Sequence, residues 1–158
     1  GGTRTGRVFT GDKSSDFLYK CLHKAKISNQ SNSDHINDGL KLNNAYITTA
    51  LKCVPPEDKP LKKELDNCSS YFEKEINYLK NLKVIVALGK IAFDACKYFY
   101  QKQFNLEKEI KFGHGKVFKL ENGISLIGCY HPSPRNVNTG RINEKKMVSL
   151  FNKIKKIN

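Results

Sequence analysis

A continuous apolar run, VIVALG at residues 84–89, passes without a linker into KIAFDACKYF, a segment of helical character. Runs of this kind are typical of strands that are buried on both faces of a parallel sheet. A strand that leads directly into a helix is also the unit from which parallel sheets are built. This feature therefore predicts an α/β fold with a mainly parallel sheet.

Other apolar runs predict further strands. ISLIGC, at residues 124–129, is a second buried strand, and the turn residues Glu121-Asn122-Gly123 join it to KVFKL in a hairpin. AYITTAL, at residues 45–51, is predicted to be another short strand.

Helices are predicted by apolar residues at helical spacing. The spacing indicates one helix near residues 14–27, capped by Ser14 or Ser15, and another at residues 144–157 with a lysine-rich outer face. A long helix is expected to begin near Pro60, since proline suits a first turn. The polar residues 28–43 are predicted to form a surface loop.

The composition fits one compact domain with a nucleic-acid partner. The chain has 158 residues, 39% of them hydrophobic, and 28 Lys and Arg against 15 Asp and Glu, for a net charge of +13. Such an excess indicates a polyanionic partner, either nucleic acid or an acidic membrane surface. A lysine-rich solubility face is the alternative. No apolar run approaches the length of a membrane span.

The five cysteines are an odd number with no export signal before them, so reduced thiols or metal ligands are expected rather than disulfides. Cys21, Cys96 and Cys129 lie among apolar residues and are predicted to be core side chains.

Unusual loops follow the predicted strands. CVPPEDKP follows AYITTAL, a Gly-Lys pair follows VIVAL, and HPSPRN follows ISLIGC, with GGTRTGRVFTGD as a further loop at the start. Ligands of α/β sheets bind beyond the carboxyl ends of the strands. These loops are therefore expected to form the functional site.

Taken together, these loops resemble the uracil-DNA glycosylase superfamily, most closely its family 5 (UDGb) type. The resemblance rests on GRVFTGD, YITTALKCVPPEDKP, VIVALGKIAFDA, FGHGKVFKL and CYHPSPRNVNTGR, which follow in the family's order over nearly the whole chain. It implies a three-layer α/β/α fold around a mainly parallel four-stranded sheet. The family's first central strand precedes GGTRTG, so we expect residues 1–158 to be a single, N-terminally truncated domain that is inactive on its own.

The resemblance implies a monofunctional DNA-repair enzyme. It would flip a deaminated base out of DNA and hydrolyse the N-glycosidic bond. His131 would stabilise the leaving base, while Asp12 would orient water or stabilise the cationic sugar. Asp58 lies where the family's pattern can carry an active-site asparagine. The structural alternatives are a strand-end histidine, a helix-capping Asp12 and a turn aspartate at position 58.

The resemblance also implies groups that hold the base and the DNA. Phe9 would stack on the flipped base, Gly11 would allow close approach of the backbone, and Ser133 and Asn136 would contact DNA. A threonine at position 49 cannot make the paired hydrogen bonds by which an asparagine reads uracil, so hypoxanthine and xanthine are expected as further substrates. Phosphate contacts are expected from the basic residues Arg7, Lys90, Arg135 and Arg141.

Cys53 and Cys68 match two of the four thiolates that hold a 4Fe-4S cluster in families 4 and 5, and two buried structural thiols are the alternative. No nucleotide cofactor is expected. The resemblance implies a monomer that acts on DNA in the cytoplasm of a prokaryote, associated with the nucleoid.

Two rival functions stay open. A family 4 type enzyme would act mainly on uracil. A non-catalytic nucleic-acid-binding domain of the same fold would have the same charge but form no product, and its DNA affinity would not depend on Asp12 or His131.

Overall fold

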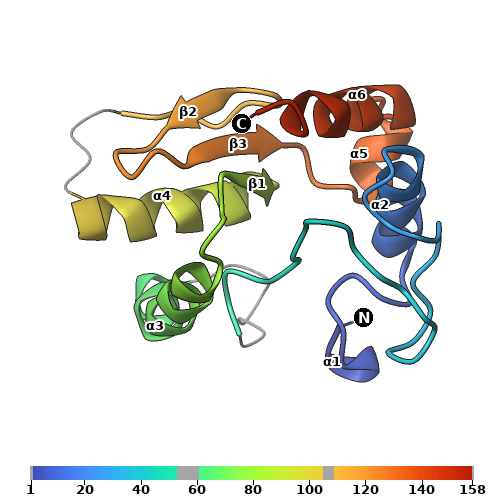
Figure 1. Cartoon of the computed structure of the whole chain (residues 1–158), viewed down its shortest axis with the longest axis horizontal. Helices are drawn as coiled ribbons and strands as arrows, with labels where there is room; N and C mark the ends of the chain where they lie inside the picture. Colours follow the sequence, from blue (N-terminus) through green and yellow to red (C-terminus); the bar gives the residue numbers. More distant parts are fainter. Residues whose placement is uncertain (1, 53–60, 105–108, 158) are drawn as a thin grey trace. The chain divides into compact units, whose positions relative to one another are not determined.

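The computed structural model describes residues 2–52, 61–104 and 109–157 (Figure 1). Two compact units are present. The first unit comprises Gly1–Thr48 and Tyr130–Asn158, and the second unit comprises Thr49–Cys129. The predicted residues Cys53, Asp58 and Pro60 lie outside the described ranges.

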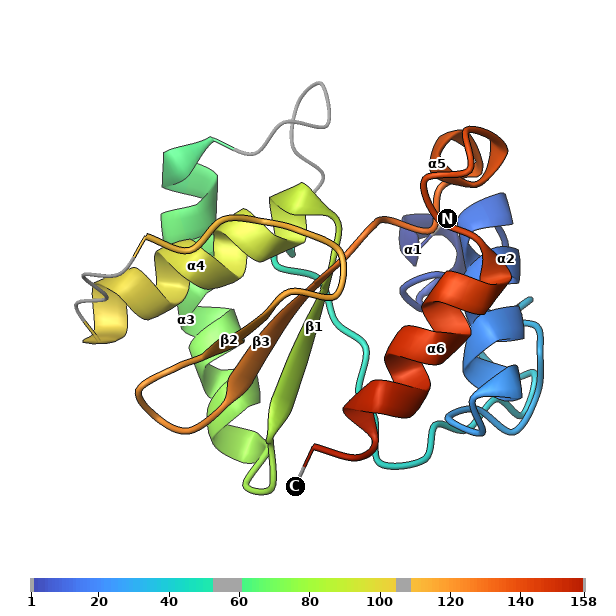
Figure 2. The same ribbon diagram turned by 90° about the horizontal axis from the view of Figure 1, so that it is seen from above.

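The second unit is built on a three-stranded sheet in the order β1-β3-β2 (Figure 2). Strand β1 (Val84–Leu88) pairs in parallel with β3 (Ser125–Cys129), and β2 (Val117–Lys119) pairs with β3 in the antiparallel sense. The predicted hairpin is therefore confirmed, and the sheet is mixed. In Figure 1, helix α4 (Lys90–Phe104) lies beside the sheet, and α3 (Lys62–Tyr78) lies beyond α4. This arrangement of helices beside a sheet confirms the α/β class.

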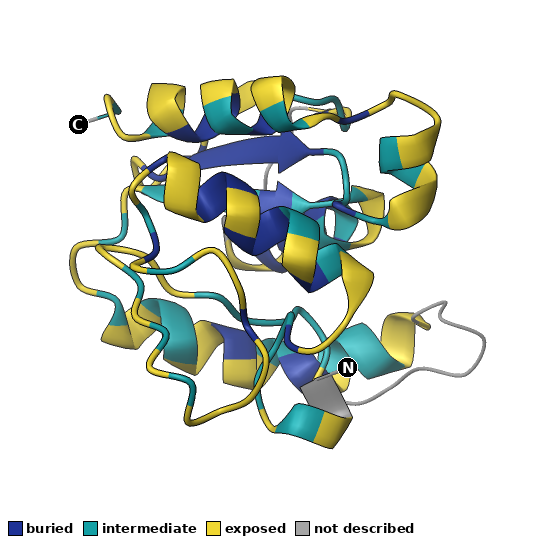
Figure 3. Cartoon of the chain, turned by 90° about the vertical axis from the view of Figure 1, so that its right-hand side faces the viewer, coloured by how far each residue is buried: buried dark blue, intermediate teal, exposed yellow. Residues whose placement is uncertain are grey.

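Two predictions about strands were wrong. Only β3 is buried along its whole length (Figure 3), whereas β1 is mostly half-buried because it is an edge strand among the described residues. The segment at residues 45–51 is not a strand in the structure. A strand needs a neighbouring strand to complete its hydrogen-bond ladder, and the described sheet consists of β1, β3 and β2 without this segment.

The core of the second unit joins the sheet to its helices. Phe93 is fully buried, with its ring centroid 5.5 Å from that of Phe112 and 5.7 Å from that of Phe118. Phe72 of α3 packs edge-on against Phe99 of α4 at 5.0 Å. The three predicted core cysteines are buried, as is Cys68.

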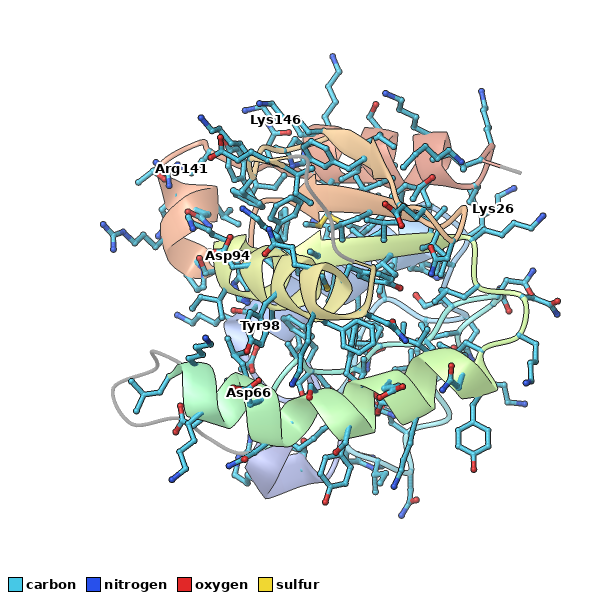
Figure 4. The ribbon with its side chains drawn as sticks, turned by 90° about the vertical axis from the view of Figure 1, so that its left-hand side faces the viewer. Lys26, Asp66, Asp94, Tyr98, Arg141 and Lys146 are labelled. Atoms are coloured by element: carbon cyan, nitrogen blue, oxygen red, sulfur yellow. The ribbon has the colours of Figure 1, made fainter. Side chains whose placement is uncertain are left out.

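A polar link joins the same two helices at the surface. The Tyr98 hydroxyl donates a hydrogen bond to Asp66 Oδ1 at 2.6 Å, and the two side chains face each other between α4 and α3 (Figure 4).

Replacing Gly128 by alanine should destabilise the protein. A Cβ at this position of the central strand β3 would lie 2.5 Å from the Gly113 carbonyl oxygen and 3.2 Å from the Phe112 ring. Because backbone and a packed ring must both move, we expect a loss of roughly 2–3 kcal/mol in the free energy of unfolding. Urea denaturation measures it, with the exposed Ser149→Ala as a control expected to change by under about 0.5 kcal/mol. A Gly128→Ala protein as stable as that control would contradict the packing described.

The first unit is helical. Helix α2 (Lys13–Lys24) packs against α6 (Glu144–Ile154), and both alternate buried and exposed faces (Figure 3). The two short helices α1 (Gly2–Thr5) and α5 (Pro134–Asn138) complete the unit. The predicted helices at 14–27 and 144–157 are thus confirmed, with shorter C-terminal ends.

The cap of α2 differs from the prediction. Asp12, rather than Ser14 or Ser15, is the N-cap: its carboxylate accepts a hydrogen bond from the Ser15 backbone N–H at 2.8 Å. Ser15 returns the interaction through its hydroxyl, which accepts from the Asp12 N–H at 3.1 Å. The cap lies two or three residues earlier than predicted because Asp12 and Ser15 together form a capping box.

Candidate active site

The first unit brings together an aromatic residue and a histidine from opposite ends of the sequence. Phe9, in the loop before α2, has its ring centroid 5.7 Å from that of His131, with 34° between the planes. His131 precedes α5, and both side chains are half-buried. The two residues predicted to hold the base and to stabilise it are therefore neighbours.

The surroundings of His131 favour the neutral form of its imidazole. Burial lowers the pKa of the imidazole below its ordinary value, and the negative charge of Asp12 opposes this with a smaller effect. Within the described residues, neither ring nitrogen has a hydrogen-bond partner in the protein. A neutral imidazole carries one N–H, so His131 can donate one hydrogen bond to a ligand.

The titration of His131 provides a direct check of this environment. We expect its ring protons to titrate in NMR spectra with a midpoint below 6.5, the ordinary pKa of the group. Replacing Asp12 by asparagine removes the charge that raises this pKa, so the midpoint should move lower still. A midpoint above 6.5, or a rise in the Asp12→Asn protein, would contradict the described surroundings.

Asp12 combines a structural role with a position near the histidine. The alternative of a helix cap is confirmed, since Oδ1 accepts the Ser15 N–H. The side chain is nevertheless exposed, and its charge acts on His131. Both roles fit one carboxylate because it has two oxygens and the cap uses one.

The segment after His131 is fastened by its own residues. Pro132 is buried, and Ser133 is the N-cap of α5, with its hydroxyl accepting the Asn136 N–H at 3.4 Å. The Asn136 side-chain amide donates to the His131 carbonyl oxygen at 2.9 Å. Ser133 and Asn136 therefore hold the histidine's backbone, while their predicted contacts with DNA stay predictions.

Arg7 lies beside Phe9 but is engaged within the protein. Its guanidinium donates to both carboxylate oxygens of Asp38, at 3.0 and 2.6 Å, and to the Ser33 hydroxyl at 2.8 Å. Its predicted phosphate contact stays a prediction. Sequence reasoning missed Asp38 and Ser33, because they lie in the polar segment taken for a surface loop, although Ser33 is fully buried.

Two other arginines of the first unit are exposed. The Arg141 guanidinium lies 5.7 Å from the centroid of the Tyr130 ring, as in a cation–π contact. Arg135, on α5, forms no ion pair with any residue that the structure describes. Neither arginine pairs with an acidic residue in the described part of the chain, so both can bind an anion.

Gly11 lies in the first unit, where its N–H donates to the Ser33 carbonyl oxygen at 2.9 Å. The other predicted residues belong to the second unit. Thr49 is half-buried, and Lys90, at the start of α4, pairs with Asp94 one turn along the helix. The Cys68 sulfur accepts a hydrogen bond from the Lys52 backbone N–H at 3.4 Å. Over the described ranges, no group of three or more histidine, cysteine or acidic side chains is arranged to hold a metal ion.

Comparison with known proteins identifies the family. A sequence model of the uracil DNA glycosylase superfamily matches residues 2–155. The chain belongs to this superfamily.

Curated relatives agree with this membership. The type-5 uracil-DNA glycosylase of Thermus thermophilus is 38% identical over 99% of this chain and 70% of its own length. The type-5 enzyme of Mycobacterium tuberculosis is 37% identical over 99% of this chain, which spans 58% of that relative. A type-4 uracil-DNA glycosylase of Archaeoglobus fulgidus is 30% identical over 60% of the chain.

Proposed function

We propose that this protein is a DNA-repair glycosylase that hydrolyses the N-glycosidic bond of uracil in DNA and leaves an abasic site. The observation that carries the proposal is the position of His131, whose ring centroid lies 5.7 Å from that of Phe9 and whose ring nitrogens bond no described residue. Burial lowers the pKa of His131, and the Asp12 charge opposes this shift. Membership of the superfamily and the names of the type-5 relatives support the same reaction.

The proposed chemistry begins with extrusion of the target nucleotide from the duplex. The Phe9 ring stacks on the flipped base. As the glycosidic bond breaks, negative charge builds on the base, and the His131 N–H donates a hydrogen bond to the developing oxyanion. Donation from a neutral imidazole needs no proton transfer, which suits a histidine whose pKa is lowered.

Asp12 acts on the sugar side of the N-glycosidic bond. The deoxyribose becomes cationic as the base departs, and a carboxylate stabilises that charge or orients the attacking water. The exposed position of Asp12 leaves its side chain accessible to water and substrate.

The segment that carries α5 contacts the DNA backbone. Arg135 and Arg141 are exposed on this segment and its continuation, and the capped helix keeps the segment ordered before DNA arrives. Arginines on such a loop bind phosphates or enter the minor groove beside the flipped nucleotide. The basic composition supports a DNA partner, and no described helix has the length and apolar character needed to cross a membrane.

Removing Arg135 and Arg141 together should weaken DNA binding in a salt-dependent way. Each phosphate contact contributes about 0.9 to the slope of log K against log salt, so the double alanine variant should lose about 2 from that slope. Fluorescence anisotropy over a salt series measures it. Lys20→Ala with Lys24→Ala is the matched control, because it changes the net charge equally but removes lysines that pair with Glu144. Equal slopes in the two double variants would exclude specific contacts by the arginines.

A cluster of the 4Fe-4S type would take ligands from Cys68 and Cys53. The backbone N–H that meets the Cys68 sulfur belongs to Lys52, the neighbour of Cys53 in sequence, so Cys68 lies close to that part of the chain. Such N–H donors stabilise cluster-bound thiolates. When bound, the cluster would cross-link the two cysteines through its iron–thiolate bonds.

Because residues 1–158 are expected to be inactive on their own, the direct test restores a strand before GGTRTG. That protein is incubated with labelled duplexes that carry uracil, hypoxanthine, xanthine or no lesion, followed by alkali to reveal abasic sites. We expect cleavage at uracil and none in the undamaged duplex. Cleavage at hypoxanthine or xanthine would support the wider range inferred from Thr49, and cleavage at uracil alone would favour a family 4 type specificity. A folded protein that binds DNA without forming abasic sites would favour the non-catalytic domain.

A further inference from the structure

The strongest unassigned feature is a partly buried ion pair that ties the Phe9 loop to residues 33–40. The side chains of Arg7 and Asp38 are 20% and 6% exposed, and the shorter of their two hydrogen bonds is 2.6 Å. Asp38 also accepts backbone N–H groups from Asp34 at 2.8 Å, His35 at 3.4 Å and Leu40 at 3.0 Å. This carboxylate therefore shapes its own loop and binds the arginine at the same time.

The arginine extends the pair to Thr10, the residue directly after Phe9. Arg7 Nε donates to the Thr10 hydroxyl at 3.0 Å, and that buried hydroxyl lies 2.8 Å from the Ser33 hydroxyl. The Gly11 N–H donates to the Ser33 carbonyl oxygen at 2.9 Å. We call Arg7, Thr10, Ser33 and Asp38 the loop clamp.

Phe9 needs such support. Its φ is 51°, in the left-handed region that non-glycine residues rarely adopt. Strained backbone of this kind persists only where its surroundings enforce it. The loop clamp bonds Arg7 and Thr10, which flank the segment that holds Phe9, and the Phe9 ring lies 5.7 Å from that of His131.

We propose that Asp38, acting through Arg7, is a positioning residue that holds the Phe9 ring against His131 for stacking on the flipped base. The proposal rests on the proposed function for its kinetic part only. Asp38 itself touches neither the base nor the sugar. Its effect passes through the backbone of residues 7–11.

The experiment compares Asp38→Asn and Arg7→Lys with Asp34→Asn. The asparagine keeps the size of Asp38 but loses its charge, and the lysine keeps the charge of Arg7 but cannot form the two-pronged bond. Asp34 is an exposed carboxylate of the same loop that does not bond Arg7, so its replacement is the matched control. The pair of test variants covers the case in which one of them does not fold.

The first measurement is independent of activity. The His131 ring protons feel the ring current of Phe9, and a Phe9→Ala protein defines their chemical shifts without it. We expect Asp38→Asn and Arg7→Lys to move these shifts toward the Phe9→Ala values, and Asp34→Asn to leave them unchanged. Unchanged shifts in both folded test variants would overturn the proposal.

The second measurement is kinetic. A displaced stacking ring should lower kcat/KM on uracil duplexes about 10–100-fold, since errors of about 1 Å in position have effects of this size. Binding of undamaged duplex by the Asp38→Asn protein should stay within about twofold, because the proposed phosphate contacts of Arg135 and Arg141 lie outside the loop clamp. Equal losses in the test variants and in Asp34→Asn would overturn the proposal. If the unaltered protein forms no abasic sites, the proposed function fails, and the chemical shifts still decide the proposal.

Discussion

His131→Ala should release uracil about 10²–10³-fold more slowly than the unaltered protein, the usual loss when one donor to a developing oxyanion is removed. The loss should appear in kcat under single-turnover conditions, because the hydrogen bond strengthens as charge builds on the base. Binding of undamaged duplex should stay within about twofold, since phosphates supply most of the affinity.

A second histidine provides the control for this prediction. His23 is exposed near the end of α2, and its Nδ1 lies 3.2 Å from the Ser28 carbonyl oxygen, so His23→Ala changes a histidine without touching the candidate site. We expect it to keep the full rate. His131→Asn should recover part of the lost rate, because its amide retains a donor. Equal rates for His131→Ala and His23→Ala would remove His131 from the chemistry.

The sequence predicted the elements that depend on local pattern. Helices α2, α3, α4 and α6 each carry apolar residues at helical spacing, and the Glu121-Asn122-Gly123 turn predicted the β2–β3 hairpin. These features follow from a few neighbouring residues, so one sequence suffices for them. The segment AYITTAL shows where such prediction ends. Its residues favour a strand, but a strand also needs a pairing partner, which is far away in the sequence and cannot be found from the local pattern.

The candidate site also has residues that the sequence indicated and contacts that it did not. Phe9, Asp12 and His131 were singled out from motif resemblance, and the structure places the first and last ring to ring. The Arg7–Asp38 pair spans 31 residues between two polar loops. Neither loop has a periodicity that would indicate the pairing, and the turn signal at Asp38-Gly39 does not name a partner. Sequence reasoning therefore assigned Arg7 to phosphate, whereas the described structure gives it an internal carboxylate.

Asp12 variants separate the two roles that meet in one carboxylate. Asn, Asp and Ser are nearly equal as N-caps, whereas alanine costs about 0.5–2 kcal/mol. Asp12→Asn and Asp12→Ser should therefore keep the free energy of unfolding, and Asp12→Ala should lower it by that amount. All three variants lose the charge that faces His131.

Activity should follow the charge and not the cap. Since groups that act on water or on the cationic sugar contribute about 10²–10⁴-fold, we expect Asp12→Asn to lose at least about 10²-fold in kcat while melting like the unaltered protein. Thermal denaturation and single-turnover cleavage of uracil duplexes, measured on the same preparations, give both quantities. An active Asp12→Asn with an unstable Asp12→Ala would reduce Asp12 to a helix cap. The glycosylase would then rely on His131 and Phe9 for its rate, because the described part of the first unit offers no other acidic side chain whose charge acts on His131.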